Sequence, residues 1–134
     1  MARTILLVDD DRDLVESLSQ VLQTRGYRVV PAYSGAEGLR LLPQVRPDLI
    51  VMDVMMETDT AGFEAIGRIR STRPDSRLAE FRGLPIIVLT AIGQVTNSRF
   101  SLDPADNFLP GVSEFLTKPV DLEGLLSAAE RLLA

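Results

Sequence analysis

Acidic residues at two distant places in the chain have the chemistry of a metal site. Asp9, Asp10 and Asp11 follow one short apolar run, and Asp53 follows another. Two carboxylates about 4 Å apart repel by roughly 4 kcal/mol at an effective dielectric of about 20, so such a cluster needs a proton or a cation. Oxygen ligands with water in the remaining positions suit Mg²⁺. If the fold brings Asp9, Asp10 and Asp53 together, we expect them to bind Mg²⁺.

A simpler role is open to part of this cluster. Aspartate is favoured at the N-cap and in the first turn of a helix, where its carboxylate accepts hydrogen bonds from backbone N–H groups. We expect Asp11 to cap the helix that follows it. One cap needs one acid, so capping does not account for Asp53.

A hydroxyl and a lysine follow two further apolar runs. Thr90 comes directly after the run 85–89, and Lys118 comes shortly after Phe115 and Leu116. A lysine in this place can act as a point charge for a phosphate group. The ordinary alternatives are a hydroxyl at a strand end for Thr90 and a solvated surface side chain for Lys118.

The composition removes several other chemistries. The chain has no cysteine and no histidine, which excludes disulfides, thiolate metal sites, histidine general bases and a phosphohistidine on this chain. Its net charge of −5 is poorly suited to holding nucleic acid, so we expect no direct nucleic-acid partner. The apolar run after Thr4 is too short for a signal peptide or a membrane span. We therefore expect a cytoplasmic protein with no membrane contact.

Strand and helix patterns alternate along the sequence. Continuous apolar runs predict strands at 5–8, 27–30, 49–52, 85–89 and 115–116. Apolar residues at helical spacing predict helices over 14–22, 34–42, 63–69 and 122–133. Strands that are apolar throughout and alternate with helices predict an α/β fold, with a parallel sheet covered by helices on both faces. A length of 134 residues predicts a single domain, residues 1–134.

Local signals set the ends of two of these helices. Ser34 and Glu37 have the spacing of a capping box at the start of the second helix, and Pro43 predicts its end. Asp121 is placed to cap the last helix.

The acids fall at the carboxyl ends of the first and third predicted strands. In open α/β sheets, ligands bind outside these ends at the point where the strand order reverses. The first and third strands flank that point in a flavodoxin-like sheet, so the fold would gather Asp9, Asp10 and Asp53 in one crevice.

Four stretches of the sequence, in this order, resemble the receiver domain of two-component response regulators. The resemblance covers nearly the whole chain, and its motifs are the stretches 5–11, 47–56, 85–91 and 115–119. It implies a flavodoxin-like (CheY-like), doubly wound, five-stranded parallel sheet with the strand order 2-1-3-4-5.

The resemblance assigns the metal and acceptor positions. Asp53 matches the phospho-accepting aspartate of the family. Asp10 matches the acid that ligates Mg²⁺ directly, and Asp9 matches the one that usually acts through a water. The backbone carbonyl of Met55 falls where the family completes the coordination sphere.

Three further positions match the residues that respond to phosphorylation. Thr90 matches the switch hydroxyl, and Lys118 matches the lysine that pairs with a phosphoryl oxygen. Phe115 matches the switch aromatic, although an ordinary core aromatic fits this position equally well. By analogy with the family, the Lys118-Pro119 peptide bond is expected to be cis.

The resemblance implies a signalling domain rather than an enzyme with a separate substrate. A phosphoryl group would pass to Asp53 from a phosphohistidine on a sensor histidine kinase or phosphotransfer protein. The domain would catalyse its own phosphorylation and dephosphorylation, at Asp53 only. The modified domain would then bind an output protein that the sequence does not name.

Three parts of the chain depart from the family pattern. The segment 71–83 is several residues longer than in typical receivers, and Glu57 stands where the family commonly has proline. Between Thr90 and Lys118, Pro104 and Pro110 cannot both lie within one regular helix. We expect the fourth-helix region, residues 91–112, to be irregular.

Two alternatives belong to other functional classes. The altered fourth-helix region would suit a receiver-like interaction module that no longer switches by phosphorylation. The run Asp9-Asp10-Asp11 also loosely satisfies the Asp-x-Asp motif of haloacid-dehalogenase-type phosphatases, which use an aspartyl nucleophile after the first strand.

Overall fold

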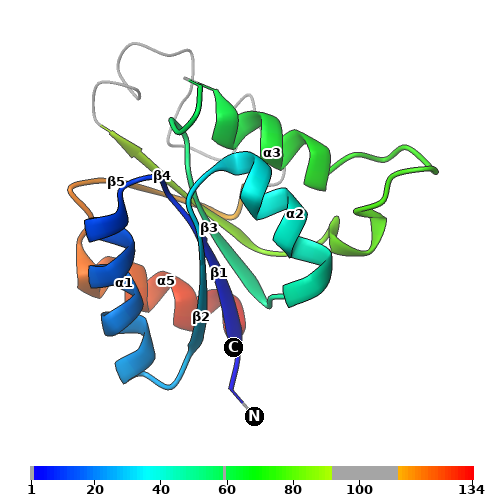
Figure 1. Cartoon of the computed structure of the whole chain (residues 1–134). Coiled ribbons are helices and arrows are strands. Elements are labelled where there is room, and N and C mark those ends of the chain that lie inside the picture. The colour runs from blue at the N-terminus through cyan, green and yellow to red at the C-terminus, as the bar shows by residue number, and fades with distance from the viewer. Residues whose placement is uncertain (1, 59, 92–111) are drawn as a thin grey trace.

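The core of the molecule is a five-stranded parallel sheet. The computed structural model describes residues 2–58, 60–91 and 112–134. Its strands are β1 (Thr4–Val8), β2 (Arg28–Ala32), β3 (Leu49–Asp53), β4 (Ile86–Ala91) and β5 (Glu114–Lys118). They pair in the order β2-β1-β3-β4-β5, which confirms the predicted topology (Figure 1).

Helices cover both faces of this sheet. The described helices are α1 (Arg12–Thr24), α2 (Gly35–Val45), α3 (Ala61–Ile69) and α5 (Leu122–Leu133), with one short 3₁₀ helix, η1 (Ala79–Phe81). Helices α1 and α5 lie on one face, and α2 and α3 lie on the other (Figure 1). Across these described segments, no helix has the length and apolar character needed to cross a membrane.

The central strands β1, β3 and β4 are apolar except at Thr4, Asp53 and Thr90, because each of their faces contributes to a separate core. In β1, Ile5 and Leu7 pack with α1 and α5, whereas Leu6 and Val8 pack with α2 and α3. Strands β3 and β4 alternate in the same way, and their side chains are almost completely buried. Burial of each such side chain contributes about 1.5–3 kcal/mol. The two cores therefore fix the register that places the strand ends together.

The predicted caps are confirmed, with differences in detail. The carboxylate of Asp11 accepts a hydrogen bond from the N–H of Leu14 at 3.1 Å and caps α1. The hydroxyl of Ser34 accepts from the N–H of Glu37 at 3.0 Å, but the returning carboxylate of Glu37 binds the N–H of Tyr33 instead of Ser34. Asp121 occupies the N-cap position of α5 without a side-chain capping bond.

The predicted end of α2 at Pro43 is wrong. The helix continues to Val45. Its C-cap residue is Arg46, whose φ of 51° lies in the left-handed region. Proline removes a single N–H donor, and the last turn is closed by the N–H of Arg46 donating to the carbonyl of Leu42 at 3.0 Å. Burial of Leu42 holds this last turn against the sheet.

The longer segment 71–83 is anchored to the rest of the fold. Its 3₁₀ helix buries Phe81 against the core on the α2 and α3 face. The guanidinium of Arg46 donates two hydrogen bonds to Glu80, at 2.9 and 3.0 Å. The guanidinium of Arg82 reaches back to the carbonyl of Ser71 at 2.6 Å. These contacts tie the extra residues to the end of α2 without touching the strand ends that carry the acids.

The expected irregularity of residues 91–112 falls almost entirely outside the described residues, since only Ala91 and Val112 of that segment are described. Ala91 is the last residue of β4, and Val112 is buried against the core on the α2 and α3 face.

Candidate functional site

The polar residues singled out by the sequence meet at one edge of the sheet. Asp53, Thr90 and Lys118 lie at or next to the carboxyl ends of β3, β4 and β5, and Asp9 directly follows β1. Asp53 and Thr90 are inside their strands and not beyond them as the sequence predicted. Asp9 is fully buried, and Asp53 and Thr90 are only 3% and 4% exposed.

Three carboxylates converge at this edge. Asp9, Asp10 and Asp53 each offer an oxygen, and these oxygens lie within 4.8 Å of one another. Asp10 is exposed, so the cluster opens to solvent on one side. The predicted convergence of the two acidic segments is therefore confirmed.

One oxygen of this cluster lacks a hydrogen bond. Asp9 Oδ1 accepts from the N–H of Asp11 at 3.0 Å. Asp9 Oδ2 is buried and accepts no hydrogen bond from the part of the chain that the structure describes, although it pairs by charge with Lys118. The amine of Lys118 also contacts Asp53, so one positive charge is shared between two buried carboxylates. The three carboxylates therefore fit a hard divalent cation, which would complete the partners of this oxygen.

Lys118 lies over the cluster. Its Nζ is 3.1 Å from Asp9 Oδ2 and 3.1 Å from Asp53 Oδ1. Burial works against the charged amine, but the attraction of Asp53 and Asp9 raises the pKa of Lys118 above its ordinary value. The Lys118-Pro119 peptide bond is cis, as expected.

The environment of Asp53 disfavours its ionised form. Burial, together with repulsion from Asp9 and a smaller contribution from Asp10, raises the pKa of Asp53 from 3.8 to about 6, even though Lys118 works in the opposite direction. Near neutral pH the carboxylate is ionised and incompletely neutralised. A further positive charge is what this site lacks.

This charge imbalance predicts that Asp53→Asn increases the stability of the fold, by an amount that depends on pH. Because the folded-state pKa lies above the unfolded one, the ionised carboxylate destabilises the fold above about pH 6, and this cost disappears as the pH falls toward 4. Without divalent ions we expect the variant to be about 1–2 kcal/mol more stable than wild type near pH 7.5, after allowance for solvent screening at the open edge. Urea unfolding in EDTA at several pH values measures the difference. A wild type as stable as the variant near pH 7.5 would contradict the charge assignment.

The two predicted switch residues lie on β4 and β5. The hydroxyl of Thr90 donates to the carbonyl of Ala91 at 3.4 Å, and the Thr90 backbone pairs with Thr117 of β5. Phe115 is half-buried and packs against the core on the α2 and α3 face. Met55 lies two residues beyond Asp53 in the following loop, and its residue exposure is 42%.

The close packing of α3 against Asp53 requires a glycine at position 62, which was not predicted from the sequence. The N–H of Gly62 donates to the carbonyl of Val54 at 2.8 Å, so the first turn of α3 lies directly against the chain leaving Asp53. A Cβ at this position would lie 2.0 Å from the carbonyl oxygen of Asp53. In the sequence, the one available signal was a glycine next to a predicted helix start.

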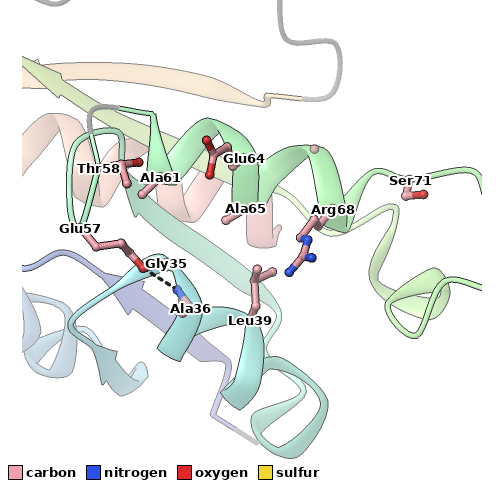
Figure 2. Close-up of a pocket in the computed structure, with 11 residues that line it drawn as sticks. Gly35, Ala36, Leu39, Glu57, Thr58, Ala61, Glu64, Ala65, Arg68 and Ser71 are labelled. Carbon is pink, nitrogen blue, oxygen red and sulfur yellow. Dashed lines mark hydrogen bonds between the residues drawn. The ribbon is translucent and has the colours of Figure 1, made fainter.

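Glu57 has a structural role that the sequence did not indicate. Its carboxylate accepts hydrogen bonds from the N–H groups of Gly35 at 2.8 Å and Ala36 at 3.0 Å (Figure 2). Partial burial opposes ionisation, but hydrogen bonds from the backbone of Ala36, Gly35 and Glu57 itself hold the pKa of Glu57 below its ordinary value. Glu57 thereby joins the loop after Asp53 to the first turn of α2, at a groove of about 640 Å³ that α2 and α3 line.

Comparisons with known proteins agree with this fold and identify its family. Residues 5–130 match the family model described as the response regulator receiver domain. The transcriptional regulatory protein GlrR of Escherichia coli is 37% identical over 94% of this chain, which spans 25% of GlrR. The response regulator MprA of Mycobacterium ulcerans is 40% identical over 99% of the chain, which spans 51% of MprA.

Solved structures show the same architecture. The chemotaxis response regulator CheY4 of Vibrio cholerae aligns with a TM-score of 0.79 at 28% identity, over 99% of this chain and 100% of that one. A CheY-like response regulator receiver domain protein from Methanospirillum hungatei aligns with a TM-score of 0.76 at 28% identity, over 99% of this chain and 94% of that one. On its sequence, its strand order and the acids at its strand ends, this chain belongs to the response regulator receiver domain family of two-component systems.

Proposed function

We propose that this receiver domain accepts a phosphoryl group on Asp53 in a Mg²⁺-dependent reaction and thereby changes a protein-binding surface. The observation that carries the proposal is the convergence of three carboxylate oxygens within 4.8 Å beside an amine that is 3.1 Å from Asp53. The single receiver domain expected over residues 1–134 stays a prediction.

The metal would be held by Asp9, Asp10, Asp53 and the backbone carbonyl of Met55. When bound, Mg²⁺ supplies the positive charge that the cluster lacks and neutralises phosphoryl oxygens near Asp53. The pairing of hard oxygen donors with a buried oxygen that accepts no hydrogen bond among the described residues supports this assignment.

The residues of the chain perform the transfer by positioning and charge. Asp53 is the nucleophile, and it is ionised near neutral pH despite its raised pKa. Lys118 pairs with an oxygen of the incoming group, and Thr90 offers a neutral hydroxyl donor to another. Because a carboxylate is a modest nucleophile, these electrostatic contacts supply most of the catalysis. The P–N bond of the donor phosphohistidine breaks as a P–O bond to Asp53 forms, which gives an acyl phosphate. Water later hydrolyses this acyl phosphate to the free carboxylate and inorganic phosphate.

The new charge then acts on β4 and β5. Thr90 moves toward the phosphoryl group, and the surface around β4 and β5, including Phe115, changes with it. With no histidine in this chain, the donor is a phosphohistidine on a sensor histidine kinase or phosphotransfer protein. The output partner is another protein. Phosphorylation and dephosphorylation are confined to Asp53. We expect the protein to act in the cytoplasm.

Intact-mass measurement after incubation with Mg²⁺ and acetyl phosphate tests the proposal. We expect the wild type to gain one phosphoryl group, and this gain to disappear in EDTA and in Asp53→Asn. Asp75→Asn is a matched control, because Asp75 is an exposed acid whose charge partner is Arg73. Absence of phosphoryl mass on the wild type would contradict the proposal and favour the interaction module that does not switch.

A further inference from the structure

The loop after Asp53 is held at its two ends by backbone hydrogen bonds. It carries Met55, whose carbonyl is a proposed metal ligand. The N–H of Val54 donates to the carbonyl of Leu89 in β4 at 3.2 Å, and the N–H of Gly62 in α3 donates to the carbonyl of Val54 at 2.8 Å. Its internal backbone contacts are long or local: the N–H of Met56 donates to the carbonyl of Thr58 at 3.1 Å, and that of Ala61 donates to the same carbonyl at 3.4 Å. Among the described residues, these contacts shape the loop but do not attach it to the end of β1, beside which Asp9 and Asp10 lie.

Glu57 provides that attachment. Each of its two carboxylate oxygens accepts one N–H from the first turn of α2, and Figure 2 shows the side chain reaching from the loop to this helix. Ser34 caps the next free N–H, that of Glu37, so the first three donors of α2 all have side-chain partners. A Cβ on Gly35 would lie 3.4 Å from Glu57 Oε1 and 3.3 Å from the carbonyl of Ala61, so the missing side chain lets the loop come close.

Helix α2 is itself fixed to the end of β1. A Cβ on Gly38 would lie 3.0 Å from Cγ2 of Val8, the residue directly before Asp9. Glu57 therefore links the loop that carries Met55, through α2, to the strand end that carries Asp9 and Asp10. The loop follows β3, whereas Asp9 and Asp10 follow β1. The contact of Glu57 with α2 therefore connects the two strand ends outside the sheet.

We propose that Glu57 is a positioning residue for the metal site. By holding its loop against the first turn of α2, it sets the distance between the carbonyl of Met55 and the carboxylates of Asp9 and Asp10, and so sets the affinity for Mg²⁺. This inference rests on the proposed function. Supporting contacts around metal ligands typically change metal affinity by about 10- to 100-fold when they are removed.

Three variants separate the hydrogen bonds of Glu57 from its charge. Glu57→Ala removes both acceptors, whereas Glu57→Gln removes the charge and keeps one acceptor oxygen. Glu64→Ala is the matched control: Glu64 lines the same groove, and its carboxylate accepts from the hydroxyl of Thr60 at 2.9 Å and not from α2. A purely electrostatic contribution would make the Ala and Gln variants of Glu57 equivalent.

Calorimetric titration of the whole chain with MgCl₂ provides the first readout. We expect Glu57→Ala to weaken binding by about 10-fold, Glu57→Gln to recover part of the loss, and Glu64→Ala to match wild type. As a second readout, amide hydrogen exchange at Gly35 and Ala36 should quicken in Glu57→Ala. As a third, its phosphorylation rate should recover when Mg²⁺ is raised to saturation, which loss of folded protein would not allow.

The outcomes distinguish this inference from the proposed function. If the wild type binds Mg²⁺ and Glu57→Ala binds it equally well, the positioning role is overturned and the proposed function stands. If the Ala and Gln variants lose affinity equally, charge alone acts and the positioning role is again overturned. If the wild type binds no Mg²⁺, both fail together.

Discussion

Lys118→Ala is expected to slow phosphoryl transfer to Asp53 by about 10²- to 10³-fold at saturating Mg²⁺, the usual cost of losing one preorganised charge donor. The amine contacts both buried carboxylates, Asp9 and Asp53, at 3.1 Å. Without it, less positive charge offsets the repulsion between the two carboxylates, and the pKa of Asp53 should rise further. The variant thus loses nucleophile ionisation as well as a partner for the phosphoryl group. Initial rates with acetyl phosphate, followed by intact mass, measure the effect.

Two further variants define what Lys118 contributes. Lys118→Arg keeps the charge but replaces a compact ammonium with a planar guanidinium, so we expect only partial recovery. Arg25→Ala removes one positive charge from an exposed pair with Glu130 and should leave the rate unchanged. A Lys118→Ala rate close to that of wild type would contradict the role of this amine. Lys118 is the only lysine in the sequence, so no other lysine side chain can replace it.

The second large effect is expected from Gly62→Ala. An added methyl group would lie 2.0 Å from the carbonyl oxygen of Asp53 and 2.8 Å from the Cα of Val54, and neither backbone atom can move independently of the acceptor site. Overpacking typically costs about 1–3 kcal/mol, and contact with backbone atoms places this substitution toward the upper end of that range. We expect a loss of that size in urea unfolding and, in the fraction that folds, slower phosphorylation of Asp53.

Gly67→Ala is the matched control in the same helix. Gly67 is exposed, and a Cβ there meets no atom within 4 Å. Alanine should therefore stabilise α3 by about 0.5–1 kcal/mol through helix propensity. A loss of stability in Gly62→Ala together with a gain in Gly67→Ala would support the close approach of α3 to the backbone at Gly62. A neutral Gly62→Ala would show that the start of α3 can shift without cost.

Most of the fold could be predicted from the sequence because the strongest patterns in the sequence were local and repeated. Apart from Thr4 and Asp53, β1 and β3 are apolar throughout, which is what burial on two faces requires, and an acid follows β1 and ends β3. These patterns predicted the sheet, the helices on both faces and the meeting of Asp9, Asp10 and Asp53. The cap at Asp11 was readable for the same reason, since its partner Leu14 is three residues away.

The features that sequence reasoning missed are contacts between distant segments. Glu57 binds the first turn of α2, 21 and 22 residues away, and no local pattern marks that partnership. The requirement for Gly62 depends on how closely α3 approaches the backbone of Asp53, which is decided by tertiary packing. The error at Pro43 has a similar cause, because burial of Leu42 kept the last turn of α2 helical beyond a residue that disfavours it.

Calorimetric titration of the metal-free protein with MgCl₂ tests the central claim most directly, because it asks whether the three converging carboxylates share one ion. We expect one Mg²⁺ per chain in the wild type. Asp10→Asn should weaken binding by at least about 10-fold, since loss of a direct ligand costs no less than loss of a supporting contact. Asp10 is exposed, so this substitution should leave the fold intact. Absence of binding in the wild type, or equal affinity in Asp10→Asn, would contradict a shared ion between β1 and β3.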